Sequence, residues 1–187
     1  MSDPYDPVTN AIQRRLAAMS FTDFIRYTKP DYEFAWHTLL MQRKIQLWID
    51  GHIKRLMIVA PPRHSKSEQV SRRLPAFLMG KFPNDEIMGC SYSADLANAM
   101  SRDVQGIMRD HKFREVFPTV QLPTGKSKKK CTEEIFEIAG DYKGKYRAAG
   151  VQGGITGLGF TWGIIDDPLK DHEEAHSQVI RDKCWNW

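Results

Sequence analysis

Short apolar runs alternate with segments of helical periodicity through the middle of the chain, and this alternation constrains the fold most strongly. The run at 55–60, RLMIVA, is closed by two prolines, which predicts a buried strand that ends at Ala60. The run at 86–93, EIMGCSYS, predicts a second strand. Because a helical pattern follows each run, we expect an α/β fold with a mainly parallel sheet.

Three segments space their apolar residues as amphipathic helices do. They lie at 37–51, where Gly51 is suited to end the helix, at 66–78 and at 94–108. Pro75 interrupts the second segment, and it lacks the amide hydrogen that an interior helical turn uses. We therefore predict that this helix kinks or breaks at Pro75.

A loop, a hairpin and a third strand complete the expected elements. Proline, glycine, serine and the basic run KSKKK at 126–130 predict an exposed loop between 113 and 132. Apolar alternation on both sides of a glycine-containing turn predicts a β-hairpin at 134–151. The stretch WGIIDDP at 162–168 predicts a short strand that ends in two aspartates and a proline.

Composition limits the class of protein more than its function. The 187 residues with 41% hydrophobic content can bury a core, and we expect a helical N-terminal segment at 1–50 before one domain at 51–187. The net charge of +4 is ordinary and identifies no partner. Three widely spaced cysteines without CxxC spacing argue against both a disulfide framework and a zinc site. Since no apolar run approaches the roughly 20 residues of a membrane span, we expect a cytosolic protein without a membrane partner.

The stretch APPRHSKSE at 60–68 partly matches a phosphate-binding loop. Such a loop aims backbone N–H groups at the phosphates, its lysine reaches the β- and γ-oxygens, and a Ser or Thr hydroxyl ligates Mg²⁺. Lys66 and Ser67 match this pattern, whereas Ala60 and Ser65 stand where it has glycines. The string by itself is equally compatible with a basic helix start whose lysine is solvated.

The carboxylate pair at 166–167 favours the nucleotide interpretation. An apolar strand that ends in Asp166 is an arrangement that holds Mg²⁺ opposite the loop hydroxyl and presents a neighbouring carboxylate to water. Both motifs follow the C-terminal ends of predicted strands, and ligands of open parallel sheets bind at that edge. A turn after a strand explains the pair taken alone, but the two motifs together predict an ATP site.

With these residues, the sequence resembles the N-terminal ATPase part of the large terminase subunit of tailed bacteriophages, the motor that packages DNA into capsids. The blocks that carry the likeness occur in order along most of the chain: RLMIVAPPRHSKSE, SYSADLANAMSRDV, FREVFP, YRAAGVQGGITGLGF and IIDDPLKDHEEA. The resemblance implies a P-loop NTPase three-layer sandwich with a mainly parallel sheet, incomplete at its C-terminus. Full-length relatives continue into the rest of that sheet and a nuclease domain, neither of which we expect in these residues.

The resemblance also implies roles for the matching residues. Lys66 would contact the phosphates and take part in catalysis, while Ser67 and Asp166 would hold Mg²⁺. Arg63 would reach toward the γ-phosphate as a further catalytic group. The residues that would line the nucleotide are Pro62, Arg63, His64, Ser65, Lys66 and Ser67. The proline-arginine form of the loop is a normal variant in this family, usually with glycine where Ser65 stands. Ser65 is therefore the one departure from the family's pattern.

The hydrolytic carboxylate has more than one candidate. Asp167 follows the magnesium aspartate, at a position where relatives often have glutamate, and is the candidate general base or water-orienting group. Glu173 and Glu174 in the next segment are the alternatives.

An arginine from a neighbouring subunit completes the site in terminase rings, and arginine fingers of this kind raise turnover by roughly 10³-fold or more. Arg102 and Arg147 are candidates, although a solvated arginine is the ordinary explanation for each. Relatives can carry a basic residue where Leu158 stands, which leaves a trans-acting arginine there in doubt. His37 and Gln42 lie where such ATPases often contact adenine, but we expect a surface or core role for them.

By resemblance, we expect ATP and Mg²⁺ as cofactors and double-stranded DNA, a portal protein and a small terminase subunit as partners. The full-length protein would form a homo-oligomeric ring in the host cytoplasm, transiently at the procapsid portal. The run at 126–130 with Lys143, Lys145 and Arg147 is the candidate DNA-backbone surface, although a solvated loop explains it more simply. Two alternatives stay open: another P-loop nucleic-acid translocase, or a non-catalytic DNA- or capsid-binding module with a decayed nucleotide site.

Overall fold

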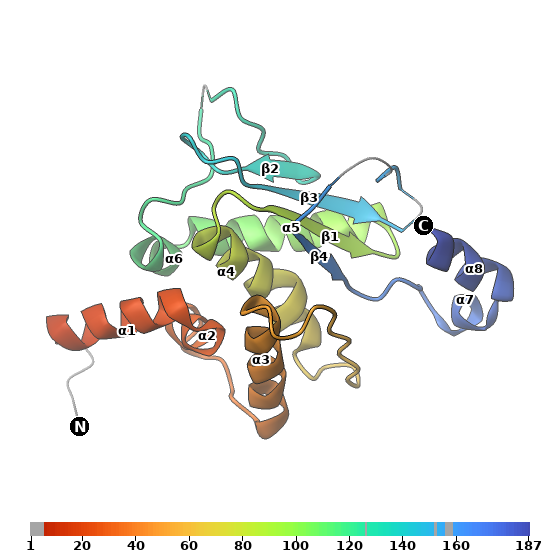
Figure 1. The fold of residues 1–187 in the computed structure, drawn as a ribbon, viewed down its shortest axis with the longest axis horizontal. Helices are drawn as coiled ribbons and strands as arrows, with labels where there is room; N and C mark the ends of the chain where they lie inside the picture. Colours follow the sequence, from red (N-terminus) through yellow and green to blue (C-terminus); the bar gives the residue numbers. More distant parts are fainter. Residues whose placement is uncertain (1–5, 126, 152, 156–158) are drawn as a thin grey trace.

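A four-stranded sheet forms the centre of the protein (Figure 1). The computed structural model describes residues 6–125, 127–151, 153–155 and 159–187. The strands are β1 Glu86–Ser91, β2 Ile135–Glu137, β3 Lys145–Gly150 and β4 Trp162–Ile165. They lie side by side in the order β2-β3-β1-β4. The predicted strands at 86–93 and 162–168 are therefore confirmed as β1 and β4.

The sheet is mixed, which corrects the predicted mainly parallel sheet. β1 pairs in parallel with β3 on one side and with β4 on the other, whereas β2 pairs antiparallel with β3. The antiparallel pair is the predicted β-hairpin, because a short connection joins antiparallel neighbours directly. Parallel pairing of β1 and β4 brings their carboxyl ends to the same edge of the sheet.

Helices surround this sheet and extend well beyond it (Figure 1). They are α1 Pro7–Met19, α2 Phe21–Thr28, α3 Trp36–Ile49, α4 Leu74–Lys81, α5 Ala94–Arg109, α6 His111–Val116, α7 His172–His176 and α8 Gln178–Asn186. The predicted helices at 37–51 and 94–108 are confirmed as α3 and α5, and α5 packs along β1 and β3. Among the described residues, no helix is both long and apolar enough to cross a membrane.

The segment at 55–60 is not the buried strand that its composition predicts. Its backbone is irregular, and Met57 and Val59 are 87% and 88% exposed. The alternate side chains of Leu56 and Ile58 are partly buried against the core. A buried strand is paired with a neighbouring strand and covered on both faces, and the described sheet, β2-β3-β1-β4, does not include this segment. Without that neighbour, only one face of the segment is covered.

A single helical stretch follows the loop, and its hydrogen bonding changes before Pro75. The six residues Glu68–Arg73 form a π-helix, in which the N–H of Leu74 donates to the carbonyl of Gln69. α4 then begins, with Pro75 in its first turn, where no intrahelical donor is required. The helix therefore does not break at Pro75. The π-helical hydrogen bonding of the preceding turn accommodates the backbone hydrogen bond that proline cannot donate. Such π-turns are frequent at functional sites.

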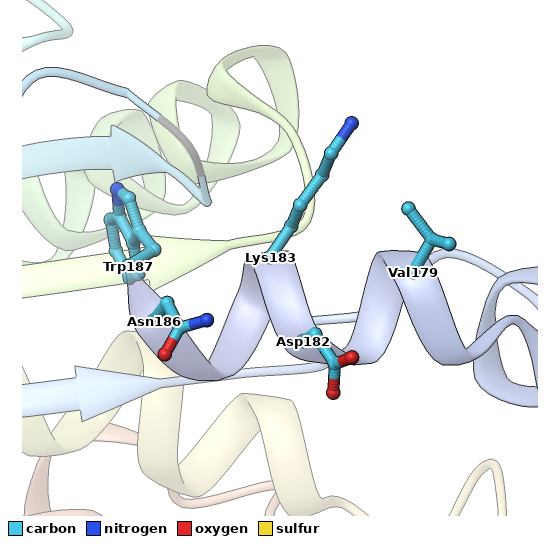
Figure 2. Close-up of a pocket in the computed structure, with 5 residues that line it drawn as sticks. All are labelled: Val179, Asp182, Lys183, Asn186 and Trp187. Atoms are coloured by element: carbon cyan, nitrogen blue, oxygen red, sulfur yellow. The ribbon is translucent and has the colours of Figure 1, made fainter.

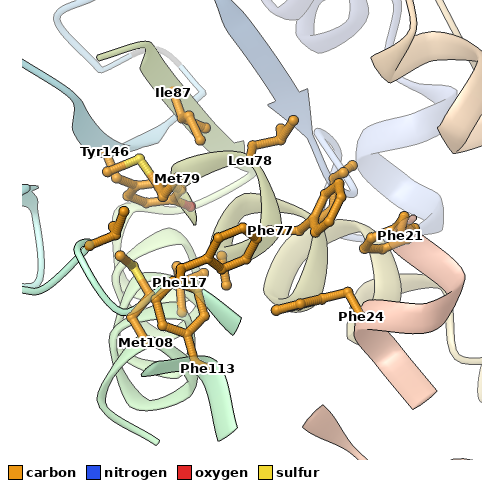
Figure 3. Close-up of a cluster of buried hydrophobic side chains, with 14 of the residues drawn as sticks. Phe21, Phe24, Phe77, Leu78, Met79, Ile87, Met108, Phe113, Phe117 and Tyr146 are labelled. Carbon is orange, nitrogen blue, oxygen red and sulfur yellow. The ribbon is translucent and has the colours of Figure 1, made fainter. Parts of the chain in front are cut away.

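An aromatic cluster joins the N-terminal helices to the centre of the molecule (Figure 3). Phe24 of α2 packs on Phe77 of α4, with ring centroids 5.3 Å apart. Phe117, directly after α6, lies 6.2 Å from Phe77 and 5.3 Å from Phe113. Since Phe77 is fully buried and contacts three rings, two from α2 and one directly after α6, it anchors α4 and the loop that leads into it.

Truncation of Phe77 tests this anchor. Phe77→Ala should lower the free energy of unfolding by about 3–5 kcal/mol, because it removes buried apolar surface and leaves a cavity. Urea denaturation followed by far-UV circular dichroism measures the change. Leu40→Ala, on the exposed side of α3, is the matched control and should stay within about 0.5 kcal/mol of the parent. Equal losses in the two variants would contradict the assignment of Phe77 to the core.

Candidate functional site

The loop at 61–67 enters its helix through two residues in the left-handed backbone region. Arg63 has φ 63° and Ser65 has φ 59°. Glycine adopts this region freely, whereas an L-residue pays roughly 1–2 kcal/mol there. Ser65 stands where a phosphate-binding loop has glycine, and the backbone still takes the conformation for which that glycine is suited. The helix begins at Lys66, directly after this turn.

Lys66 and the two aspartates after β4 converge. The Nζ atom of Lys66 lies 2.5 Å from Oδ1 of Asp167 and 3.2 Å from Oδ1 of Asp166. The Lys66 side chain is 23% exposed, so water screens these contacts only in part. Residues far apart in the sequence are therefore brought together at the carboxyl end of β4, as the two motifs predict.

Backbone pairing beyond the end of β4 fixes the positions of both aspartates. The N–H of Asp166 donates to the carbonyl of Cys90 at 2.9 Å, and the N–H of Tyr92 donates to the carbonyl of Asp167 at 3.1 Å. Asp167 has φ 46°, a left-handed conformation that turns the chain at the sheet edge. Its side chain is 60% exposed, whereas that of Asp166 is 4% exposed. The two carboxylates thus differ in environment: one is buried and the other is open to water.

Ser71 supplies the second partner of the buried carboxylate. Its Oγ donates to Oδ2 of Asp166 at 2.5 Å, while Lys66 contacts Oδ1. The prediction from the sequence was that Ser67 would lie opposite Asp166. Ser71 lies about one turn further along the helical stretch, on the same side as Ser67, so helical periodicity is the signal that would have found it. Among the described contacts, Ser67 makes no hydrogen bond to Asp166.

The electrostatics of the cluster keep Lys66 protonated. Burial lowers the pKa of its ammonium, but the hydrogen bond to Asp167 and the charge of Asp166 outweigh burial and raise the pKa above its ordinary value. A cation between two carboxylates leaves the cluster with an excess of negative charge. Carboxylate oxygens at such a place suit a hard cation such as Mg²⁺, and Asp166 and Asp167 are the residues that can hold it.

Glu68 fixes the start of the helix. Its carboxylate accepts from Nε of Arg73 at 3.0 Å and also pairs with Arg72 at 3.4 Å and Lys29 at 3.7 Å. Burial raises the pKa of Glu68, but the hydrogen bond and charge of Arg73, aided by the other cations, bring it below its ordinary value. Arg73 in turn donates to Oγ1 of Thr28 at 3.2 Å. The helix that carries Lys66 is therefore fastened to the end of α2.

His64 turns toward α3 and makes no recorded contact with the carboxylates. Its ring lies 5.2 Å from that of His37, and its Nδ1 is 2.9 Å from the carbonyl oxygen of Pro62. His37 was not a predicted site residue, yet it borders the loop. Gln42 and Gln69 are fully buried, and their side-chain amides find no hydrogen-bond partner among the described residues. Ordered water or a ligand usually satisfies such groups.

The other predicted catalytic residues lie outside this cluster. Glu174 accepts a hydrogen bond from the backbone N–H of Lys170 at 2.8 Å and thus helps to cap α7. Glu173 is exposed on α7, and Arg102 pairs with Glu133. Arg147 lies on β3. Leu158 falls outside the described residues.

Some basic side chains of the candidate DNA-backbone surface already form contacts with other groups of the protein. Lys129 donates to the carbonyl of Ile138 at 2.7 Å and also to that of Tyr142. Lys145 pairs with Glu86 at 2.8 Å. Lys126 lies outside the described residues, so the structure describes only part of the candidate surface.

An open hollow along α8 is separate from the Lys66 cluster (Figure 2). It is lined by Val179, Asp182, Lys183, Asn186 and Trp187. Trp187 reaches back to donate from Nε1 to the carbonyl of Gly153 at 2.8 Å. Neither the loop at 61–67 nor Asp166 and Asp167 line the hollow. The candidate site is therefore identified from the side chains that converge on Lys66 and not from this hollow.

The contrast between Ser71 and Ser67 is measurable. Ser71→Ala removes the donor to a buried carboxylate and should lower the free energy of unfolding by about 1–3 kcal/mol. Ser67→Ala is the control, since Ser67 makes no recorded side-chain cap bond and alanine favours a helix; its effect should stay below about 0.5 kcal/mol. Chemical denaturation at neutral pH compares the variants. A larger loss for Ser67→Ala would mean that Asp166 depends on the other serine.

Comparison with known proteins identifies the family. The family model described as terminase large subunit, T4likevirus-type, N-terminal, matches residues 57–187, which include the loop, Lys66 and both sheet-edge aspartates. No match was found among curated proteins or among solved structures. Terminase large subunits of bacteriophages are generally ATPases that package DNA. The matched region covers most of the chain, and the protein belongs to the N-terminal family of terminase large subunits.

Proposed function

We propose that this chain contains the ATPase core of a viral DNA-packaging motor, with a Mg-ATP site formed by the loop at 61–67 and the carboxylates at 166–167. The observation that carries the proposal is the convergence of Lys66 with Asp166 and Asp167. A P-loop site requires a lysine in the loop, the start of a helix after the loop, and a carboxylate at the end of a strand. On this proposal, residues 51–187 form part of a P-loop three-layer sandwich behind a helical segment at 1–50.

The loop is suited to receive phosphates. Left-handed residues at 63 and 65 turn the backbone immediately before the helix that starts at Lys66. Successive N–H groups in such a turn, together with those of the first helical turn, form an anion-binding concavity. Pro62 and His64 would border the nucleotide, and Arg63, exposed beside them, would reach the γ-phosphate.

Lys66 would exchange partners when ATP binds. In the structure, its ammonium contacts two carboxylates. Mg²⁺ bound by Asp166 and a serine hydroxyl would neutralise the same carboxylates and leave Lys66 free to contact phosphate oxygens. Ser67 stays our proposed hydroxyl ligand, and its place at the start of the helix suits that role. Ser71 would orient Asp166 through its hydrogen bond to the carboxylate oxygen Oδ2.

Asp167 is the proposed general base or water-orienting group. It is the more exposed of the two aspartates and follows directly after the magnesium candidate. Glu173 and Glu174 are further along the chain, and Glu174 is already engaged with the backbone of Lys170. This engagement favours Asp167 over Glu174.

The motor itself would act through a wider assembly. We propose double-stranded DNA, bound through its phosphates, as the translocated substrate, and a portal protein and a small terminase subunit as partners of a homo-oligomeric ring. Arg102 or Arg147 would enter a neighbour's site; Arg102 would first have to leave Glu133. The place of action would be the host cytoplasm, at the procapsid portal.

Loss of Lys66 should weaken nucleotide binding. Lys66→Ala removes the charge that contacts the phosphates, so Mg-ATP affinity should fall by about 10–100-fold, or roughly 1.4–2.8 kcal/mol. Isothermal titration with a nonhydrolysable ATP analogue and Mg²⁺ measures the change. Lys54→Ala replaces an exposed lysine and should bind as the parent does.

A folding defect must be separated from a binding defect, because Lys66→Ala removes one partner of buried Asp166. Lys66→Arg keeps a cation beside both carboxylates, and we expect it to fold as the parent and still to bind Mg-ATP more weakly, since a guanidinium does not reproduce a compact ammonium. Unchanged binding by both Lys66 variants would refute the proposed site and favour the interaction module with a decayed nucleotide site.

Asp167→Asn should separate binding from hydrolysis. Asparagine tolerates a left-handed backbone, so the turn should persist. Mg-ATP binding should be retained, because one competitor for Lys66 is weakened, while phosphate release should fall by about 10²–10⁴-fold as general-base assistance is lost. Steady-state phosphate release with and without DNA measures the rate. Full hydrolysis by this variant would move the role to another carboxylate, with Glu173→Gln as the next substitution.

A further inference from the structure

A histidine pair lies on α7, just beyond the sheet-edge carboxylates. The five residues of this helix read HEEAH and fit the H-E-x-x-H pattern, in which a helix presents two histidines on one face to zinc. His172 and His176 are both exposed. The cysteine spacing argued against a zinc site, but that argument does not extend to histidines.

The two imidazoles already have the geometry of a chelate. Their Nε2 atoms are 2.9 Å apart, and the ring centroids are 4.1 Å apart. Two Zn–N bonds of about 2.0–2.1 Å that meet at about 90–110° place their nitrogens about 2.9–3.4 Å apart. The spacing of the two Nε2 atoms therefore fits two ligands of one ion.

The helix that presents the pair is held at both ends. Asp171 caps it by accepting the N–H of Glu174 at 3.0 Å, and the side chain of Glu174 accepts the N–H of Lys170 at 2.8 Å. At the other end, the N–H of Ser177 donates to the carbonyls of Glu173 and Glu174. Because the backbone is fixed by these bonds, the two histidines start from one helical spacing, and the ion would have less backbone freedom to remove.

We propose that His172 and His176 form a binding site for a borderline-soft divalent transition metal ion of the Zn²⁺ class. In the structure, the Nε2–H of one ring donates to Nε2 of the other. On binding, the donor ring takes its other neutral tautomer, with its proton on Nδ1, and both Nε2 atoms coordinate the ion. Imidazole nitrogens suit Zn²⁺, Cu²⁺ and Ni²⁺, whereas Mg²⁺ prefers oxygen.

The site is a two-histidine chelate with open positions for water. Among the described residues, no group of three or more His, Cys, Asp and Glu side chains is arranged around a metal ion. A hydrolytic zinc centre uses three protein ligands, so we assign binding and no peptidase chemistry. Exposed acidic side chains at Asp171 and Glu173 add favourable charge nearby. The bound ion would fasten the helix that follows the carboxylate strand.

Titration of Zn²⁺ alone into tag-free protein tests the proposal. The titration is run in a non-chelating buffer at slightly alkaline pH, because ligating imidazoles must be unprotonated. We expect one ion per chain and a loss of affinity of at least about tenfold, equivalent to about 1.4 kcal/mol, in His172→Gln and in His176→Gln. Excess Mg²⁺ should not displace the ion.

Matched variants isolate the pair. His111→Gln replaces an exposed histidine on α6 and should bind Zn²⁺ as the parent does, and Lys66→Arg should also bind normally, which separates this site from the nucleotide site. A second measurement covers any folding defect: saturating Zn²⁺ should slow hydrogen exchange of amides 173–177 in the parent and in these two control variants, and not in His172→Gln or His176→Gln. The proposal fails if the parent binds no ion, if His111→Gln loses as much affinity as the pair variants, or if exchange in α7 is unchanged.

Discussion

The ion cluster at the end of β4 is the contact on which the functional part of the structure depends. A carboxylate that is 4% exposed needs compensation, because desolvation of an unpaired charge costs several kcal/mol. Asp166 obtains it from the ammonium of Lys66 and the hydroxyl of Ser71. Both partners belong to the helical stretch after the loop, so one ionic contact joins loop, helix and sheet edge. The same contact keeps the candidate phosphate-binding lysine beside the candidate magnesium ligand before any nucleotide arrives.

The sequence correctly predicted the elements that follow from apolar periodicity or from pairing between neighbouring segments. The helices α3 and α5 follow from apolar spacing, and the hairpin β2–β3 from alternation around a turn. The meeting of Lys66 and Asp166 was also predictable, because each follows a segment that reads as a strand and parallel strands end at one edge. That argument reached the correct contact although one of its premises, a strand at 55–60, was wrong. β1 supplies the sheet edge, and backbone pairing of Asp166 with Cys90 holds the aspartate there.

The failures have physical causes that a single sequence does not contain. An apolar run at 55–60 predicts a strand only if another strand lies beside it, and the described sheet ends at β4. Met57 and Val59 therefore remain exposed in spite of their type. Ser67 was favoured because the motif spacing names it, whereas the hydroxyl that contacts Asp166 is that of Ser71, about one turn further along the same side of the helical stretch. Mixed rather than mainly parallel pairing follows from the hairpin at one edge.

The charges of the cluster also bear on what the proposed site can accept. One ammonium between two carboxylates leaves a negative excess, so a free nucleotide triphosphate would meet repulsion from Asp166 and Asp167. An ion that arrives with the phosphates removes this repulsion and releases Lys66 from the aspartates in the same step. In the proposed Mg-ATP site, metal and nucleotide would therefore favour each other's binding through Lys66, and the magnitude of that coupling would be equal in both directions by linkage. The left-handed backbone conformation of Ser65 does not contribute to this coupling, because the loop already has that conformation.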